Sequence, residues 1–155
     1  EPPAVNVTEI ESGVVELKGD VKISTEPTDH RPVGPTIAFR FDHGNDAVVV
    51  AGDTIPCAGL DKLCTGAKGL VHTVIRKDII ENIPLQRLQD VCDYHSSVEE
   101  ASQTAERAGI ETLVLTHYVP AFPSGQGEEW EEIASQHFSG RIELGDDLHR
   151  VEIGQ

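Results

Sequence analysis

Methionine is absent from all 155 residues, position 1 included, so we expect the native protein to have residues before Glu1. Long hydrophobic runs are also missing: no apolar stretch approaches the 18 residues of a membrane-spanning helix, and no secretion signal is recognisable. Basic residues are scarce, because 12 Lys and Arg stand against 27 Asp and Glu, which gives a net charge of −15. A broad basic face that would bind a polyanion is therefore not expected.

Cysteine is rare as well, with only Cys57, Cys64 and Cys92. An odd number without a C-x-x-C spacing fits no closed set of disulfides, so we expect reduced thiols and a cytoplasmic protein. What is present is a globular composition, with 38% hydrophobic and 25% charged residues. A chain of this length buries enough surface for one domain with its own core, and we treat residues 1–155 as that domain.

The first third of the chain is typical of antiparallel β structure. Short, alternating, β-branched segments at 5–10, 14–17 and 21–24 are separated by turn residues and predict a meander. Residues 37–41 alternate apolar and polar side chains, which predicts a strand with one buried face. The run 47–51 is continuously apolar and predicts a strand that is buried on both faces.

The second part of the chain alternates between strands and helices. We expect strands at 69–74, 113–115, 141–144 and 148–153, helices at 60–63, 98–108 and 128–138, and a less regular helical stretch at 77–91. Ser97 and Glu100 have the spacing of a capping box at the start of the helix 98–108, and Gly109 ends it. Antiparallel strands that lead into a β-α-β-α-β series predict an α/β fold with one sandwich layer.

Polar residues that can bind metals follow several of these strands. Asp53 comes directly after the run 47–51, His117 follows the strand 113–115, His30 lies in the loop before residue 37, and His95 precedes the capped helix. A carboxylate and imidazoles at the ends of neighbouring strands are how an α/β fold builds a metal site. Each residue alone also fits an ordinary role, Asp53 in a turn and His72 as a buried, hydrogen-bonded core residue.

The order of these pieces resembles a known family. Asp29-His30-Arg31-Pro32-Val33, Gly52-Asp53-Thr54 after a buried strand, Leu70-Val71-His72, His95-Ser96-Ser97 before a helix, and Leu115-Thr116-His117 follow one another. Over about residues 5–123, this series resembles the C-terminal half of metallo-β-lactamase superfamily hydrolases, and most of all their ribonuclease Z and arylsulfatase-like branch. The resemblance implies half of an αβ/βα sandwich, a mixed sheet with helices on its outer face.

The same resemblance implies roles for four residues. His30 would bind a first divalent metal, Asp53 would bridge two metals, and His117 would bind the second, with zinc as the usual metal of the family. His95 would be catalytic without binding a metal, near the leaving group. Asp53 would thereby share in catalysis, because two cations acidify a bound water to a hydroxide that is available near pH 7. An imidazole such as His95 can protonate a leaving oxygen.

Two departures from the family limit what the resemblance implies. The signature His-x-His-x-Asp-His is absent, so we expect an N-terminal half of the same fold, in the same parent protein or as a separate chain, to supply it and to cover the exposed sheet. The exposed apolar sheet also favours an oligomer. The isolated 155 residues are then expected to be inactive. In addition, His72-Thr73-Val74-Ile75 stands where ribonuclease Z enzymes have His-Glu-Ala-Thr, and there is no room for their RNA-binding arm before Gly52.

These departures favour a hydrolase that acts on a small molecule. The substrate would be an ester, a lactone, a sulfate ester or a phosphodiester, and neither nucleic acid nor a membrane would be a partner. Two alternatives remain: a non-catalytic or partner-dependent half-domain, and an endoribonuclease that processes the 3′ end of transfer RNA. The apolar positions within 79–92 predict either a lid over the substrate pocket or a surface helix packed on the core.

Overall fold

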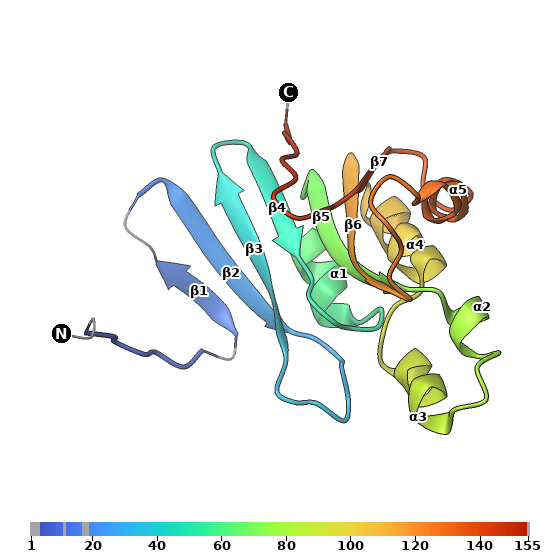
Figure 1. Cartoon of the computed structure of the whole chain (residues 1–155). Helices are drawn as coiled ribbons and strands as arrows, with labels where there is room; N and C mark the ends of the chain where they lie inside the picture. The colour runs from blue at the N-terminus through green and yellow to red at the C-terminus, as the bar shows by residue number, and fades with distance from the viewer. Residues whose placement is uncertain (1–3, 11, 17–18, 155) are drawn as a thin grey trace.

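A single mixed β-sheet runs through the whole chain (Figure 1). The computed structural model describes residues 4–10, 12–16 and 19–154. The seven strands lie in chain order: β1 (Gly13–Glu16), β2 (Val21–Pro27), β3 (Ile37–His43), β4 (Asp46–Val50), β5 (Gly69–Ile75), β6 (Thr112–Val119) and β7 (Arg141–Leu144). Pairs from β1 to β4 are antiparallel, and pairs from β4 to β7 are parallel. The predicted meander followed by parallel strands, and with it the α/β class, is confirmed.

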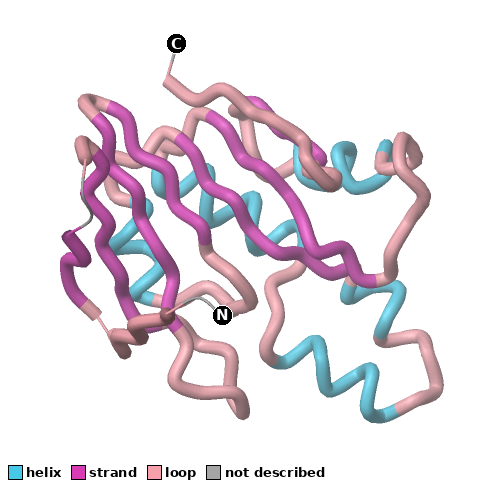
Figure 2. Tube along the Cα trace, turned by 60° about the vertical axis from the view of Figure 1, so that its left-hand side comes forward, coloured by secondary structure: helices cyan, strands magenta, loops and turns pink. Residues whose placement is uncertain are grey.

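The longer helices lie on one face of this sheet, where they enclose the core (Figure 2). The helices are α1 (Ala58–Cys64), α2 (Lys77–Ile80), α3 (Gln86–Gln89), α4 (Val98–Ala108) and α5 (Glu128–Ser135), with a 3₁₀ turn η1 (Asp90–Asp93) before α4. Leu60 of α1, Ala105 of α4 and Trp130 of α5 pack with buried strand residues such as Val49 and Leu113. No described helix is long and apolar enough to cross a membrane.

Helix α4 begins and ends as the sequence predicts. The Ser97 hydroxyl accepts from the Glu100 N–H at 3.2 Å, and the Glu100 carboxylate accepts from the Ser97 N–H at 2.8 Å, which completes the capping box. Gly109 ends the helix in the left-handed region at φ 69°, a conformation that costs glycine little. The start of α4 is therefore fixed in space, and His95 lies just before it.

The opposite face of the sheet is only partly covered, so the expectation that 47–51 is buried on both faces is wrong for β4. Ala47 and Val49 are buried beneath the helices, whereas Val48 is half-buried and Val50 is 37% exposed on the other face. The C-terminal segment 145–154 crosses part of this face, and a Cβ at Gly69 would come within 3.1 Å of the Ile153 side chain. The rest of the face is open among the described residues.

Several predicted boundaries differ from the structure. Residues 5–10 form no strand, and Val7 is 82% exposed there. The segment 148–153 is irregular, because Leu148 has φ 63° and turns the chain across the sheet. Strand β6 continues past His117 to Val119, α5 ends at 135 instead of 138, and 77–91 is divided into α2, α3 and the start of η1. β1 matches the predicted segment 14–17 as far as residue 16, and residue 17 lies outside the described part of the chain.

The three cysteines are free, as predicted.

Candidate metal centre

Three loops at the edge of the sheet bring His30, Asp53 and His95 together. Asp53 follows β4 through Gly52, which has φ 65°, and the Thr73 hydroxyl of β5 donates to the Gly52 carbonyl at 2.8 Å. His30 lies between β2 and β3, and His95 lies between η1 and α4. One ligand atom from each of the three residues lies within 4.8 Å of those of the other two. The structure thus brings two of the three predicted metal ligands, His30 and Asp53, together with His95, the predicted proton donor.

Backbone carbonyls orient the rings of His30 and His95. His30 Nδ1 lies 2.8 Å from the Tyr94 carbonyl oxygen, and His95 Nδ1 lies 3.1 Å from the Val91 carbonyl oxygen. Because a carbonyl oxygen only accepts, each Nδ1 must carry the hydrogen, and the lone pair of a neutral ring is then on Nε2. Metal-binding histidines are commonly oriented in this way. The two acceptors lie in or beside η1 and are backbone atoms, so no side chain in the sequence could have indicated them.

The Asp53 carboxylate has an unsatisfied oxygen that fits a cation. Its Oδ1 is buried and has no hydrogen-bond partner among the described residues. His117 Nδ1 lies 3.6 Å from that atom, and His95 Nε2 lies 3.7 Å from Oδ2. Leaving a buried acceptor without a partner is costly, and a metal ion would satisfy it. The donor set of imidazole nitrogens and a carboxylate suits zinc and similar divalent metals.

His117 reaches the same carboxylate from β6. Its side chain is 50% exposed, its φ is 55°, and its ring lies parallel to that of His95 with 6.2 Å between the centroids. His95 approaches both His30 and Asp53, whereas His117 approaches Asp53 and lies outside the group of three. All four predicted residues thus lie near one another, and their division into metal ligands and a proton donor stays a prediction.

Burial favours neutral imidazoles here. It lowers the pKa of His95 below its ordinary value, because the charged ring would lose solvation. The effect is larger for His72 in β5, which is fully buried with a pKa of about 4. His72 Nδ1 donates to the Thr73 carbonyl at 2.7 Å, and its Nε2 has no partner among the described residues. His72 lies outside the group of three ligand-bearing residues.

The segment 77–93 leaves the sheet after β5 as the short helices α2 and α3 (Figure 1) and ends in η1, two residues before His95. Apolar side chains along it are exposed: Leu85, directly before α3, is 53% exposed, and Leu88 of α3 is 37% exposed. Its last turn carries the Val91 carbonyl that orients His95. The segment therefore supports the site through its backbone, and its action as a lid stays a prediction.

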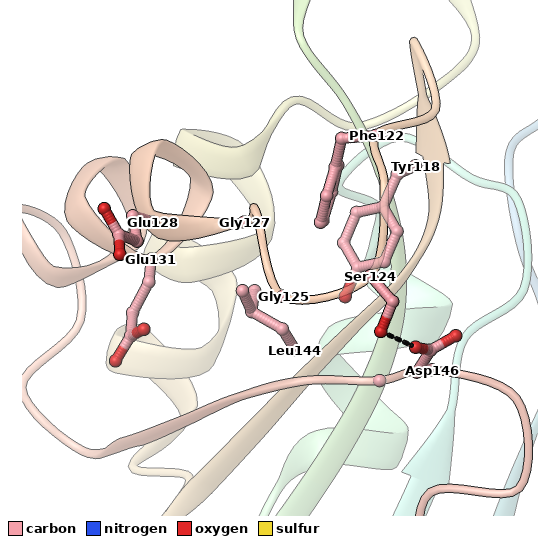
Figure 3. Close-up of a pocket in the computed structure, with 10 residues that line it drawn as sticks. Tyr118, Phe122, Ser124, Gly125, Gly127, Glu128, Glu131, Leu144 and Asp146 are labelled. Carbon is pink, nitrogen blue, oxygen red and sulfur yellow. Dashed lines mark hydrogen bonds between the residues drawn. The ribbon is translucent and has the colours of Figure 1, made fainter.

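A cavity of about 350 Å³ lies elsewhere, between the loop after β6 and the end of β7 (Figure 3). Tyr118, Phe122 and Leu144 line it, and the Ser124 hydroxyl donates to Asp146 at 2.5 Å across its mouth. Burial raises the pKa of Tyr118 to about 12. None of the four candidate site residues lines this cavity, so it is distinct from the metal centre.

Proteins of similar sequence carry one name. Ribonuclease Z from Mycobacterium avium (strain 104) is 62% identical over 152 residues, which cover 98% of this chain and 54% of that protein. A ribonuclease Z homologue from Mycobacterium tuberculosis (strain CDC 1551 / Oshkosh) is 58% identical over 152 residues, 98% of this chain and 68% of the homologue. The chain thus spans about half the length of most of these relatives. No family model matches it.

Solved structures with the same fold are more distant in sequence. The metallo-beta-lactamase fold protein YhfI from Bacillus subtilis has a TM-score of 0.69 at 20% identity, over 90% of this chain and 52% of that one. The short form of human tRNase Z has a TM-score of 0.63 at 19% identity, over 94% of this chain and 47% of the human chain. These likenesses confirm the predicted metallo-β-lactamase fold.

Proposed function

This chain belongs to the ribonuclease Z family, and from that membership and the metal centre we propose that it forms part of a metal-dependent endoribonuclease that processes the 3′ ends of transfer RNA precursors. The observation that carries the proposal is the arrangement of His30, Asp53 and His95, whose ligand atoms converge within 4.8 Å beside a buried carboxylate oxygen without a partner. Such a donor set would be a costly arrangement in a protein without a metal.

The chain's own residues would hold two divalent metals and move one proton. His30 would bind the first metal through Nε2, Asp53 would bridge the pair, and His117 would bind the second. Metals bound there would acidify a water and polarise the phosphodiester. His95 is anchored to the Val91 carbonyl through Nδ1, so the lone pair of its Nε2 is directed towards Asp53. Nε2 can take up a proton there and pass it to the leaving oxygen.

The remaining metal ligands would come from residues outside this chain. The chain covers about half of the Mycobacterium avium relative, and one face of its sheet carries exposed or half-buried apolar residues such as Val48 and Val50. We expect the remaining half of the fold to pack on this face and to complete the metal centre at its edge. The inactivity of the isolated 155 residues follows as a prediction.

The comparisons favour RNA processing over the small-molecule hydrolysis that the sequence had indicated. Relatives with 58–62% identity are called ribonuclease Z, so neither the missing His-Glu-Ala-Thr nor the missing arm places the chain outside that family. A net charge of −15 is a sum over the chain, whereas RNA binding depends on local potential and on the whole protein. The expectation that nucleic acid is no partner is therefore replaced by this proposal.

The test uses the intact protein with its metal. It would be incubated with a transfer RNA precursor that has a 3′ trailer and, in parallel, with a p-nitrophenyl ester and a bis(p-nitrophenyl) phosphodiester. The proposal predicts endonucleolytic removal of the trailer, which stops on chelation and returns when metal is added back. Hydrolysis of the small esters alone, with the precursor left intact, would overturn the RNA substrate and favour a small-molecule hydrolase.

A further inference from the structure

Two buried hydroxyls connect the loops that bear the metal-binding residues. Thr54 follows Asp53, Ser96 follows His95, and both side chains have no exposed surface. We propose that Thr54 and Ser96 are positioning residues, which hold the loops of His30, Asp53 and His95 in place around the metal centre before a metal binds. The inference rests on the proposed metal centre and concerns its assembly, independently of which substrate it cleaves.

Thr54 links the loop that carries His30 to the loop that carries Asp53 by hydrogen bonds. Its Oγ1 accepts a hydrogen bond from the Asp29 N–H at 3.1 Å, one residue before His30. The single hydroxyl hydrogen can be donated either to the Asp29 carbonyl at 3.1 Å or to the Ile55 carbonyl at 2.8 Å. The Ile55 N–H donates to the Asp29 carbonyl at 2.9 Å, which adds a backbone bridge. The residues next to His30 and Asp53 are therefore joined by a side chain and a backbone bond.

Ser96 links the turn that carries His95 to the loop that carries Asp53 by a hydrogen bond. Its hydroxyl donates to the Thr54 carbonyl at 2.7 Å, in a fully buried contact. Its own carbonyl accepts from the Ile75 N–H at 3.0 Å, at the end of β5. Thr54 is thus the common point of three loops: it follows Asp53, its side chain holds Asp29, and its carbonyl holds Ser96. Buried hydrogen bonds between loops restrict their motion, and a preformed site loses less entropy when it binds its ligand.

The neighbouring serine provides a matched control. Ser97 has the same side chain and is also buried, but its hydroxyl caps α4 by accepting from Glu100, and the structure gives it no bond to the Asp53 loop. Removal of the Ser97 hydroxyl should weaken the helix, whereas removal of the Ser96 hydroxyl should loosen the metal centre. A comparison of Ser96 with Ser97 therefore separates an effect on zinc affinity from an effect on the stability of the fold.

The experiment measures zinc affinity of the intact, metal-free protein by competition with a chromophoric chelator, together with the melting temperature. Thr54→Val and Ser96→Ala should each weaken zinc binding by about 10- to 100-fold, because each removes a hydrogen bond that holds the loop of Asp53. Thr54→Ser, which keeps the hydroxyl, should restore most of the affinity. Ser97→Ala should bind zinc like the parent while its melting temperature falls by about 2–4 °C.

Several outcomes would overturn the inference. Parent-like zinc affinity in Thr54→Val and Ser96→Ala would show that the hydroxyls serve stability alone, and an equal loss in Ser97→Ala would show a general effect of weaker folding. A parent protein that binds no zinc would also overturn it. If Thr54→Val fails to fold, the zinc affinity of Ser96→Ala alone tests the positioning role. The zinc measurement uses no RNA, so the two proposals can fail separately. A protein that follows the zinc pattern here but does not cleave the precursor in the test of the proposed function contradicts that function and supports the positioning role.

Discussion

Asp53 is the residue on which the metal centre depends most, because its carboxylate lies between two imidazoles. His95 and His117 lie 3.7 and 3.6 Å from its two oxygens, and one of those oxygens is buried without a partner. A carboxylate in this position can bridge two cations, which neither neutral imidazole can do. Changes at single residues of this group should therefore have separable effects on metal content and on turnover.

Asp53→Ala should abolish metal binding, because it removes the bridging carboxylate. The measurement is the zinc content of the purified intact protein after dialysis, by atomic emission. Asp61→Ala is the matched control, since Asp61 is a partly exposed carboxylate on α1 that pairs with Arg107 on the surface. Equal zinc content in Asp53→Ala and the parent would refute the bridging role.

His95→Ala should keep the metal and lower kcat by about 10²- to 10⁴-fold, because the variant loses a group that moves a proton in the transition state. Zinc content and precursor cleavage would be measured on the same sample. Loss of zinc from this variant would identify His95 as a metal ligand, as its place in the group of three also permits.

For single residues, the sequence predicted the parts of the candidate site that consist of metal-binding or proton-transferring side chains. Asp53 could be found because it follows an apolar strand, and His117 because it follows the apolar part of β6. His30 and His95 could be found because their motifs resemble a family. The orientation of His30 and His95 could not be predicted, since the Tyr94 and Val91 carbonyls belong to the backbone. Thr54 and Ser96 were visible only as parts of motifs, and their partners are distant in the sequence, 25 residues away for Asp29 and 42 for Ser96 from Thr54.

Among the elements, those with a local signal were predicted well. The capping box of α4 and the alternation of β3 depend on neighbouring residues, so the sequence alone indicates them. The apolar residues of 148–153 suggest a strand equally well, but Leu148 at φ 63° turns this segment onto the open face of the sheet. Which apolar segments pair and which cover a face is decided by tertiary packing, which a local pattern does not contain.

Helix α1 packs so closely on β2 that only glycine fits at one contact. A Cβ at Gly59 would lie 1.9 Å from the Pro27 carbonyl oxygen, a backbone atom that cannot move away cheaply. Gly59→Ala should therefore lower the free energy of unfolding by about 1–3 kcal/mol, measured by urea denaturation. In the control Gly34→Ala, the new Cβ meets no atom within 4 Å outside its two chain neighbours, and a change below about 0.5 kcal/mol is expected. Equal stability of the two variants would contradict the close approach.

In the whole molecule, one face of the sheet is packed and the other is partly open. The helices cover Val49, Leu70 and Leu113 completely, while Val50 on the other face is 37% exposed. A chain of about half the length of its relatives would leave such a face for the rest of the fold. The class of fold was predictable from the order of strands and helices. The RNA substrate that we propose was not favoured by the sequence, because composition and missing motifs outweighed the family resemblance.

Buried His72 should make the stability of the whole protein depend on pH. Its pKa is about 4 in the folded state and near 6.5 when it is unfolded, so the unfolded state binds more protons between these values. The contribution of His72 to the free energy of unfolding should be constant above pH 6.5, fall by about 3 kcal/mol as the pH drops to 4, and then level off. His72→Asn should reduce this slope relative to the parent in urea titrations at several pH values. An unchanged slope would mean that His72 is not the group that titrates.

The central claim is that Asp53 bridges metals held by this edge of the sheet, and anomalous X-ray scattering at the zinc edge tests it most directly. In crystals of the intact, zinc-loaded protein, the account predicts two peaks about 2.0–2.2 Å from the Asp53 oxygens, one beside His30 Nε2 and the other beside the His117 imidazole. Zinc bound at another place, with no peak next to Asp53, would contradict it.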